Sequence, residues 1–487
     1  MNKIRTIHTL FIIPSGSHTK SPCQEELALW TIRRKIVRHQ YFGYLSDQDY
    51  LQLGNSKFQH VGLLSLCAVF REHGYDVRYF TPEEETIDDL LLQKIAACDM
   101  LLVSSYTYNL NVSIVYTRRL KELNPKMLIG IGGYHAPHVP EATLRTDNGQ
   151  LFDFTMSGYT EKAILRIPIA YEHGGIEAFK RIPQIMYLDT EKGFQHNRNV
   201  DFPSLADLPL PANDLIPDFD LTAARVFSVY GCPFQCQMCN LGKQDSYSER
   251  PLSLFEQEIE YFVTEKRVKY IYVGDPTIGI NLKRLKELVK IMNRFPTIKW
   301  GGQTRLSIAQ QHEFRAILQD SECVHLEIGV ETLSQKLLNT IRKDINAERS
   351  EDILYKLAEN QKLHIQTNWI FGLPGADEKD ILFDRAKILQ LIHDGFDAGL
   401  SMCVPHPSSA MFDKPEQFGI TIEETNWDEF PLYGKPVFSQ IHGLTGAELF
   451  ELYKETTMEM TKAFKKKYRD VLPETPVKDI SLVPSYF

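Results

Sequence analysis

Three closely spaced cysteines have the clearest capacity for chemistry in this sequence. Cys232, Cys236 and Cys239 form a CxxxCxxC pattern, and the proline, glutamine and asparagine around them suit a loop. Three thiolates on one loop can bind three irons of a cubane cluster and leave the fourth iron open. Zinc would need a fourth ligand, and no second CxxC or HxxxH motif is evident in the chain. We therefore predict a [4Fe–4S] cluster whose open iron is available to a cofactor or substrate.

The composition narrows the class of function. A chain of 487 residues is too long for one hydrophobic core, so several domains are expected. The 54 Lys and Arg residues against 63 Asp and Glu give a net charge of −9, which does not favour nucleic acid as a partner. No run of about 18 apolar residues occurs, so no membrane span is predicted. The five cysteines outside the trio are dispersed, which indicates reduced thiols and a cytoplasmic protein.

The first half of the chain alternates between short apolar strands and amphipathic helices. Residues 61–72 have helical apolar spacing and end at a glycine, as a helix C-terminus does. Strands are predicted at 75–80, 100–104, 127–131 and 152–156. This alternation predicts an α/β, Rossmann-like domain with a parallel sheet over residues 58–200. Residues 1–57 are expected to form an N-terminal extension, with a buried strand near residues 10–13.

A second βα series follows a Pro- and Asp-rich linker at residues 201–224. A strand at 225–230 leads into the cysteines, and five later strands are predicted at 270–273, 299–304, 324–330, 365–371 and 398–404. About six βα units predict a partial (β/α)6 barrel over residues 225–410, with its active site at the carboxyl ends of the strands. Residues 411–487 are expected to form a small C-terminal cap of loops and helix.

The CxxxCxxC pattern after a strand resembles the signature of the radical SAM superfamily. Five later segments resemble segments of that family in the correct order, at 273–278, 300–305, 327–332, 369–375 and 402–407. The resemblance implies that the open iron chelates S-adenosylmethionine (SAM). One electron then cleaves SAM to a 5′-deoxyadenosyl radical, which abstracts hydrogen from an unactivated carbon.

The resemblance also implies which residues contact SAM. Asp275 is the candidate for its amino group, and Gln303, Arg305 and Glu331 are candidates for other polar contacts. The alternative for each is pairing within the barrel interior. The family commonly has an aromatic residue before the third cysteine, packing on the adenine. This chain has Met238 there, and a thioether can also pack on a π face.

Residues 58–80, 100–109, 128–142 and 152–163 resemble the cobalamin-binding domain that precedes many radical SAM barrels. The resemblance implies that the corrin and its nucleotide tail approach four residues, Ser104, Tyr106, Gly132 and Gly133. His135 is a further candidate contact, with an ordinary loop role as its alternative. No DxHxxG motif is present, so the resemblance implies cobalamin without a lower histidine ligand. The alternative for the domain is a scaffold that has lost cobalamin.

The combined resemblance implies a radical SAM enzyme that uses cobalamin, most commonly to methylate an sp³ carbon. The expected substrate is a natural product, peptide or lipid, and the expected electron donor is a flavodoxin or ferredoxin. Two alternatives remain open. One keeps the cofactors but performs cyclisation, rearrangement or oxidation, and the other is a non-catalytic iron–sulfur sensor. The sequence identifies no catalytic acid or base.

Overall fold

A computed structural model describes most of the chain and divides it into two compact units. The described residues are 3–14, 23–41, 45, 57, 59–217, 221–241, 247–424, 426–430, 435–441 and 443–469. The first unit is assigned residues 1–20, 57–219 and 426–430, and the second is assigned residues 21–56, 220–425 and 431–487. Within the described ranges, no helix is long and apolar enough to cross a membrane.

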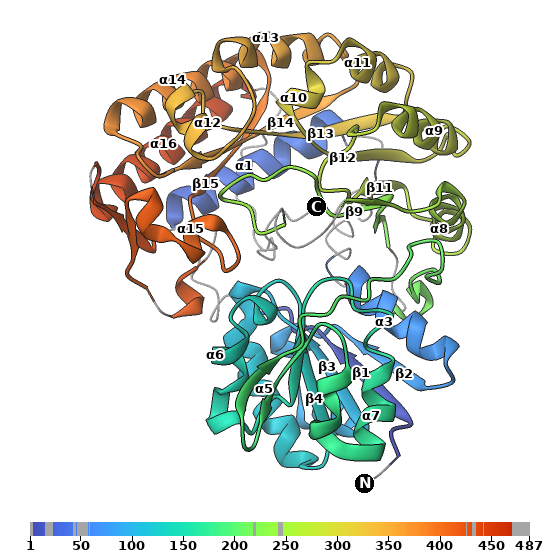
Figure 1. Cartoon of the computed structure of the whole chain (residues 1–487). Helices are drawn as coiled ribbons and strands as arrows, with labels where there is room; N and C mark the ends of the chain where they lie inside the picture. The colour runs from blue at the N-terminus through green and yellow to red at the C-terminus, as the bar shows by residue number, and fades with distance from the viewer. Residues whose placement is uncertain are drawn as a thin grey trace. The chain divides into compact units, whose positions relative to one another are not determined.

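The first unit contains a seven-stranded sheet (Figure 1). Across the sheet, the strands are β2 (Asp76–Phe80), β1 (Thr6–Leu10), β3 (Met100–Ser104), β4 (Leu128–Gly132), β5 (Phe154–Met156), β6 (Ile185–Asp189) and β7 (Gly193–His196). The strands from β2 to β5 pair in parallel, and β6 and β7 are antiparallel additions at one edge. Both faces are buried, as in parallel sheets generally: Leu101 and Val103 enter one core, whereas Met100 and Leu102 enter the other.

Helices cover both faces of this sheet, which confirms the Rossmann-like prediction. They are α3 (Val61–Glu72), α4 (Asp89–Ala96), α5 (Leu110–Leu123), α6 (Pro140–Leu144) and α7 (Arg166–Gly174). Side chains of α4 and α5 fill one core, and side chains of α3 and α7 fill the other. The crossovers leave the carboxyl ends of β3 and β4 at one edge of the sheet, where ligands bind in open α/β folds.

The N-terminal strand β1 lies inside this sheet, between β2 and β3. The predicted division had left residues 1–57 as an extension outside the domain, whereas the structure places their first strand at its centre. The buried polar residues His8 and Thr9 interrupt the apolar pattern of β1, which hides it in the sequence. His8 is accommodated because its Nδ1 lies 2.8 Å from the carbonyl oxygen of Ile95.

The second unit contains a six-stranded, wholly parallel sheet. Across the sheet, the strands are β15 (Asp397–Met402), β14 (His364–Phe371), β13 (Cys323–Glu331), β12 (Lys299–Arg305), β11 (Tyr270–Val273) and β8 (Ala223–Val226). The edge strands β15 and β8 do not pair with each other, so the barrel is open, as the partial (β/α)6 prediction requires. Five of the six predicted strands agree with β11 to β15 to within two residues at each end. The strand predicted at 225–230 is divided in the structure between β8 of this sheet and β9 (Val229–Tyr230), which pairs elsewhere.

Helices follow the convex side of this sheet as an arc in Figure 1. The long ones are α8 (Leu252–Thr264), α9 (Leu282–Met292), α11 (His312–Gln319), α13 (Ala347–Ala358) and α14 (Glu378–Asp394), and the short ones are α10 (Leu306–Ala309), α12 (Gln335–Thr340) and α15 (Ala410–Asp413). Two small antiparallel pairs join β9 (Val229–Tyr230) to β10 (Ser248–Glu249) and β16 (Ile420–Ile422) to β17 (Phe438–Gln440).

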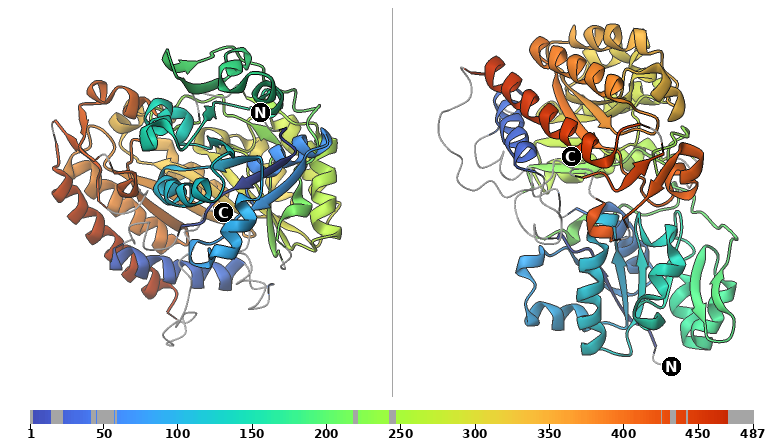
Figure 2. Two further views of the ribbon diagram at one scale, coloured as in Figure 1. Left: turned by 90° about the horizontal axis from the view of Figure 1, so that it is seen from below. Right: turned by 90° about the vertical axis from the view of Figure 1, so that its left-hand side faces the viewer.

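Helix α1 (Gln24–Tyr41) also belongs to the barrel unit, although the predicted division placed it in the N-terminal extension. It lies beside the last helix, α16 (Gly446–Lys467), as both views of Figure 2 show. Glu26 of α1 accepts a hydrogen bond from the Tyr453 hydroxyl of α16. Residues 1–57 thus supply one strand to the first unit and one helix to the second.

Candidate cofactor sites

The cysteine loop begins where β9 ends, in the barrel unit. Gly231 follows the strand with a φ of +72°, a backbone conformation that favours glycine and turns the chain into the loop. Cys232, Cys236 and Cys239 are all partly exposed and form no disulfide. The three thiols are therefore accessible to iron.

The other five cysteines differ in environment. Burial raises the pKa of Cys67 to about 11, and it raises the pKa values of Cys23, Cys98, Cys323 and Cys403 to about 12. A thiol with a raised pKa is a poor source of the thiolate that metals bind. All eight cysteines lie among the described residues, and each is free of a disulfide.

Hydrogen bonds from distant segments hold the cysteine loop. The Gln237 N–H donates to the Ile341 carbonyl at 3.0 Å, and the Gln237 carbonyl accepts from the Ala410 N–H at 3.1 Å. The Ser408 hydroxyl donates to the Asn240 carbonyl at 3.2 Å. Residues 341, 408 and 410 therefore hold the cysteine loop in place.

Donors also point at the sulfur atoms. Arg305 Nη1 donates to Cys236 Sγ at 2.8 Å, and the Leu241 N–H donates to Cys239 Sγ at 3.4 Å. Among the described residues, no three His, Cys, Asp or Glu side chains converge as they would around a single ion. Three thiols on one loop, two of them with N–H donors directed at their sulfurs, are the donor set of a [4Fe–4S] cluster with an open iron. The chain's residues thus fit that cofactor.

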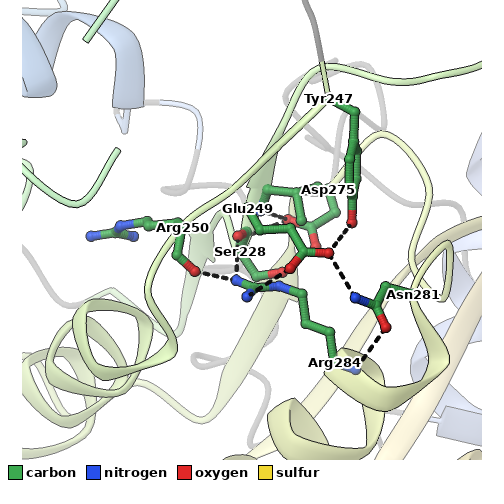
Figure 3. A network of polar contacts seen from close by, with 8 residues as sticks. Ser228, Tyr247, Glu249, Arg250, Asp275, Asn281 and Arg284 are labelled. Atoms are coloured by element: carbon green, nitrogen blue, oxygen red, sulfur yellow. Dashed lines mark hydrogen bonds and ion pairs between the residues drawn. The ribbon is translucent and has the colours of Figure 1, made fainter. Parts of the chain in front are cut away.

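Asp275 lies after β11 and fixes the segment that leads into the cysteines (Figure 3). Its carboxylate accepts hydrogen bonds from the Ser228 N–H at 2.6 Å, the Ser228 hydroxyl at 2.5 Å and the Val229 N–H at 3.0 Å. Burial raises the pKa of Asp275 to about 6, although these donors oppose that shift. In the described structure its oxygens are engaged by the chain itself, and contact with the SAM amino group stays a prediction.

Arg284 of α9 supports the same segment, and sequence reasoning did not single it out. Its Nη2 donates to the Ser228 carbonyl at 2.7 Å and also to the Arg250 carbonyl (Figure 3). Beside it, Glu249 accepts from the Tyr247 hydroxyl at 2.8 Å and from Asn281 Nδ2 at 2.9 Å. These contacts connect α9 to the strand before the cysteines. Arg284 and Ser228 are 56 residues apart in the chain, so their spacing in the sequence does not indicate the contact.

Glu331 ends β13 in the left-handed region, with a φ of +67°. Its carboxylate forms a buried ion pair with Lys343, a partner that the sequence did not indicate. A Cβ on Gly329 would lie 2.5 Å from Glu331 Oε1 and 2.7 Å from Lys343 Nζ, so glycine at that position leaves room for the pair. As with Asp275, contact of Glu331 with SAM stays a prediction. Gln303 is partly exposed on β12, opposite Glu327 of β13 in the register.

The predicted cobalamin residues of the first unit lie together at the carboxyl ends of β3 and β4. The Ser105 N–H donates to the Gly132 carbonyl at 2.9 Å. Gly133 has a φ of +93°, and a Cβ there would lie 2.3 Å from the Ser105 carbonyl oxygen. A Cβ on Gly132 would meet no atom within 4 Å. Gly133 is therefore closely packed in this turn, whereas Gly132 leaves open space beside it.

Aromatic rings surround this turn. Tyr106 stacks against Tyr108 at 5.6 Å and against Tyr134 at 5.4 Å between ring centroids. Phe11, just after β1, meets Tyr106 edge-on at 5.5 Å. Ser104 is buried, and its hydroxyl lies 3.0 Å from His60 Nε2. Partly exposed aromatic rings therefore gather at this edge of the sheet.

His135 has a different environment from its neighbours in the turn. It is buried, its Nδ1 lies 3.1 Å from the Thr107 hydroxyl, and its ring meets Trp427 edge-on at 4.5 Å. Asn426 also accepts a hydrogen bond from Asn111 of α5 at 3.0 Å. Residues 426–430 had been predicted as part of the cap, yet they pack within the first unit. The described contacts give the His135 ring a packing role, and its contact with cobalamin stays a prediction.

Two family models match the chain. The model described as the radical SAM superfamily matches residues 226–384, and the model described as the B12 binding domain matches residues 55–167. The chain therefore contains a radical SAM domain and a B12-binding domain. The radical SAM match contains the cysteine loop and the strands from β11 to β14, and the B12-binding match contains β2 to β5.

Relatives named as methyltransferases are similar to this chain over most of its length. An uncharacterized methyltransferase of Pyrococcus horikoshii is 24% identical over 72% of this chain and 77% of its own length. The bacteriochlorophyllide d C-12(1)-methyltransferase of Chlorobaculum tepidum is 23% identical over 76% of each chain. The solved structure of TsrM from Kitasatospora setae, with cobalamin and a [4Fe–4S] cluster bound, has a TM-score of 0.62 at 15% identity. It covers 80% of this chain and 82% of that chain. The structural likeness supports the two-domain fold, and the domain matches identify [4Fe–4S], SAM and cobalamin as the cofactors.

The inner face of the radical SAM barrel carries a polar network that sequence reasoning did not assemble. Glu327 accepts from the Tyr272 hydroxyl at 3.0 Å and from Asn368 Nδ2 at 3.2 Å. Gln366 donates to Asn368 Oδ1 at 2.8 Å, and Arg225 lies over the Tyr272 ring at 5.2 Å. Alternation along the strands could have suggested that these residues share a face, but their partners depend on the register between strands.

Proposed function

We propose that the chain is a cobalamin-dependent radical SAM methyltransferase that methylates an unactivated carbon of a natural-product, peptide or lipid substrate. One observation carries the proposal: both domains occur in one chain, and relatives named as methyltransferases align with it over about three quarters of its length.

The cofactors supply the difficult chemistry, because the cluster provides the electron that cleaves SAM and cobalamin provides the methyl group. Cys232, Cys236 and Cys239 would hold the cluster, with Arg305 and the Leu241 N–H directed at its sulfur ligands. We further propose that Gln303, Glu331 and Asp275 contact SAM and that Met238 packs on its adenine.

The turn at the carboxyl end of β4 would receive cobalamin. The open space at Gly132 and the stacked rings of Tyr106, Tyr108 and Tyr134 would accept a corrin or its nucleotide tail. Ser104 and His135 would support the turn from below. We also propose that a low-potential donor of the flavodoxin or ferredoxin type supplies electrons, and that the protein acts in the reducing cytoplasm.

The proposal can be tested without knowing the substrate. Protein reconstituted anaerobically with iron, sulfide and cobalamin is mixed with SAM and a chemical reductant. A methyltransferase should release S-adenosylhomocysteine in proportion to its bound cobalamin, since methyl transfer to the reduced corrin needs no substrate. A cyclase or oxidase should release only 5′-deoxyadenosine, and that result would reject methyl transfer.

Two cysteine variants separate the two uses of SAM. Cys236→Ala should abolish 5′-deoxyadenosine, because the cluster loses a ligand, and it should leave S-adenosylhomocysteine formation nearly unchanged. Cys403→Ala is the matched control, because that cysteine is buried outside the loop. A chain that makes neither product with all three cofactors bound would be the predicted iron–sulfur sensor instead of an enzyme.

A further inference from the structure

Arg305 contacts the cysteine loop at two points. It ends β12, and its guanidinium donates through Nη1 to Cys236 Sγ at 2.8 Å. The guanidinium carbon also lies 3.9 Å from the centre of the Phe234 ring, in cation–π contact. Both partners belong to the cysteine loop, so one side chain connects the end of a barrel strand to a cluster ligand and to the residue two positions before it.

The charge of Arg305 is buried, and among the described residues no carboxylate pairs with it. The residue is 7% exposed. Its Nε atom is buried and has no hydrogen-bond partner within the described residues. Its contacts in that part of the chain are Cys236 and Phe234, and no described Asp or Glu pairs with it. A buried cation is costly unless a negative charge lies beside it, so this environment calls for an anionic group.

The cluster has the required charge. A cubane core with three thiolate ligands carries a net negative charge, and reduction by one electron makes it more negative. A fixed cation and an N–H donor at a ligand sulfur stabilise the reduced form more than the oxidised form. From these contacts we propose that Arg305 is a positioning residue that raises the reduction potential of the cluster by donating to the Cys236 sulfur.

This inference rests on the three-cysteine cluster and not on methyl transfer. One electron from an external reductant converts the oxidised cluster to the reduced cluster, and no covalent bond or proton changes at Arg305. Phe234 has a supporting role, because its ring face holds the guanidinium plane in the orientation that reaches the sulfur.

The test is an anaerobic redox titration of the reconstituted protein, followed by the electron paramagnetic resonance signal of the reduced cluster. Arg305→Gln should lower the ratio of reduced to oxidised cluster about tenfold at the wild-type midpoint, which for one electron equals a shift of about 59 mV. Arg305→Lys keeps the charge but not the planar fork and should shift in the same direction by less. Phe234→Leu should also produce a smaller shift of the same sign.

Arg342→Gln is the matched control. Arg342 is exposed beside the loop, where it lines a cleft of about 480 Å³ together with Phe234 and Lys343. Its loss removes a nearby positive charge while the contact with Cys236 stays in place, so the midpoint should remain near that of the wild type. An equal shift in Arg305→Gln and Arg342→Gln would show a general charge effect and overturn the proposal.

Two further outcomes decide the matter. A wild-type midpoint in Arg305→Gln, together with weakened SAM binding by calorimetry, would assign the residue to SAM and overturn the proposal. If Arg305→Gln fails to retain iron, the Arg305→Lys and Phe234→Leu titrations decide instead. Lowered midpoints in both would support the proposal, and a wild-type midpoint in either would overturn it.

Discussion

Arg33 of α1 and Asp397 of β15 form a two-pronged ion pair, although 364 residues separate them in the chain. Arg33 Nε donates to Oδ1 at 2.6 Å, and Nη2 donates to Oδ2 at 2.9 Å. His364 Nε2 lies 3.4 Å from the same carboxylate. The pair attaches a helix from the start of the chain to the last strand of the open barrel.

Removing Arg33 should destabilise the barrel unit strongly. Arg33→Gln leaves the buried Asp397 carboxylate without its guanidinium partner, and loss of one partner of a buried pair costs about 3–5 kcal/mol. The measurement is the urea-induced unfolding of the barrel unit at neutral pH. Arg385→Gln breaks a more exposed pair with Glu455 and should cost about 1 kcal/mol or less. An equal loss of free energy of unfolding in the two variants would show that burial does not make the Arg33 pair more stabilising than the exposed pair.

The same pair predicts the sign of a pH dependence. Burial alone would raise the pKa of Asp397, but Arg33 and His364 together hold it well below its usual range. A lowered folded-state pKa contributes stability above the unfolded pKa of about 3.9, and this contribution is lost only as the pH falls through the folded value. In Arg33→Gln the pKa of Asp397 should instead be raised. The variant should then gain stability as the pH falls from about 7.5 to about 5.5, so its free energy of unfolding should come closer to that of the wild type. A difference in the free energy of unfolding that instead grows as the pH falls would contradict a raised pKa of Asp397 in the variant.

Asp275 should control how well the chain loads iron. An asparagine in place of this aspartate would offer one acceptor oxygen to three donors, so the turn at Ser228 and Val229 that leads into the cysteine loop should loosen. We expect Asp275→Asn to retain about half or less of the wild-type iron and sulfide after reconstitution. Iron content per chain is the measurement.

Asp384 supplies a closely matched control for that variant. It is buried, burial raises its pKa to about 6, and it accepts from the Thr332 hydroxyl at 2.6 Å and the Leu333 N–H at 2.8 Å. Because it lies on α14 and not beside the cysteine segment, Asp384→Asn should lower stability without loss of iron. Equal loss of iron from both variants would assign the effect to general unfolding.

The two adjacent glycines of the first unit should respond differently to alanine. Gly133→Ala places a Cβ against the Ser105 carbonyl at a positive φ, so the first unit should lose at least about 2 kcal/mol. Gly132→Ala adds its Cβ in open space, so without cobalamin the variant should unfold with the same free energy as the wild type. If cobalamin approaches this turn, Gly132→Ala should also retain less corrin absorbance after desalting. Wild-type retention in Gly132→Ala would place the cofactor elsewhere.

Several features of this protein could be determined from the sequence because they depend on neighbours in the chain. The spacing of Cys232, Cys236 and Cys239 lies within one loop, and their chemistry follows from it. Period and length identified most strands, including the wholly buried β3 and β11, because a buried strand needs apolar side chains wherever it sits. Strand β1 was harder to predict, because its buried polar residues His8 and Thr9 break the apolar pattern of a buried strand. Both are accommodated by contacts with residues far away in the sequence.

Only the tertiary structure decided which side chains meet. Arg305 and Cys236 are 69 residues apart, and Asp275 reaches Ser228 across 47 residues. The partner of Glu331 is Lys343, and Trp427 packs on His135 of the first unit although most of its neighbours in the chain belong to the second. Residue type limits what a side chain can do, but strand register and long-range packing select its partner. A sequence therefore predicts a cluster loop more readily than it predicts the cation, the carboxylate and the helix that hold the loop in place.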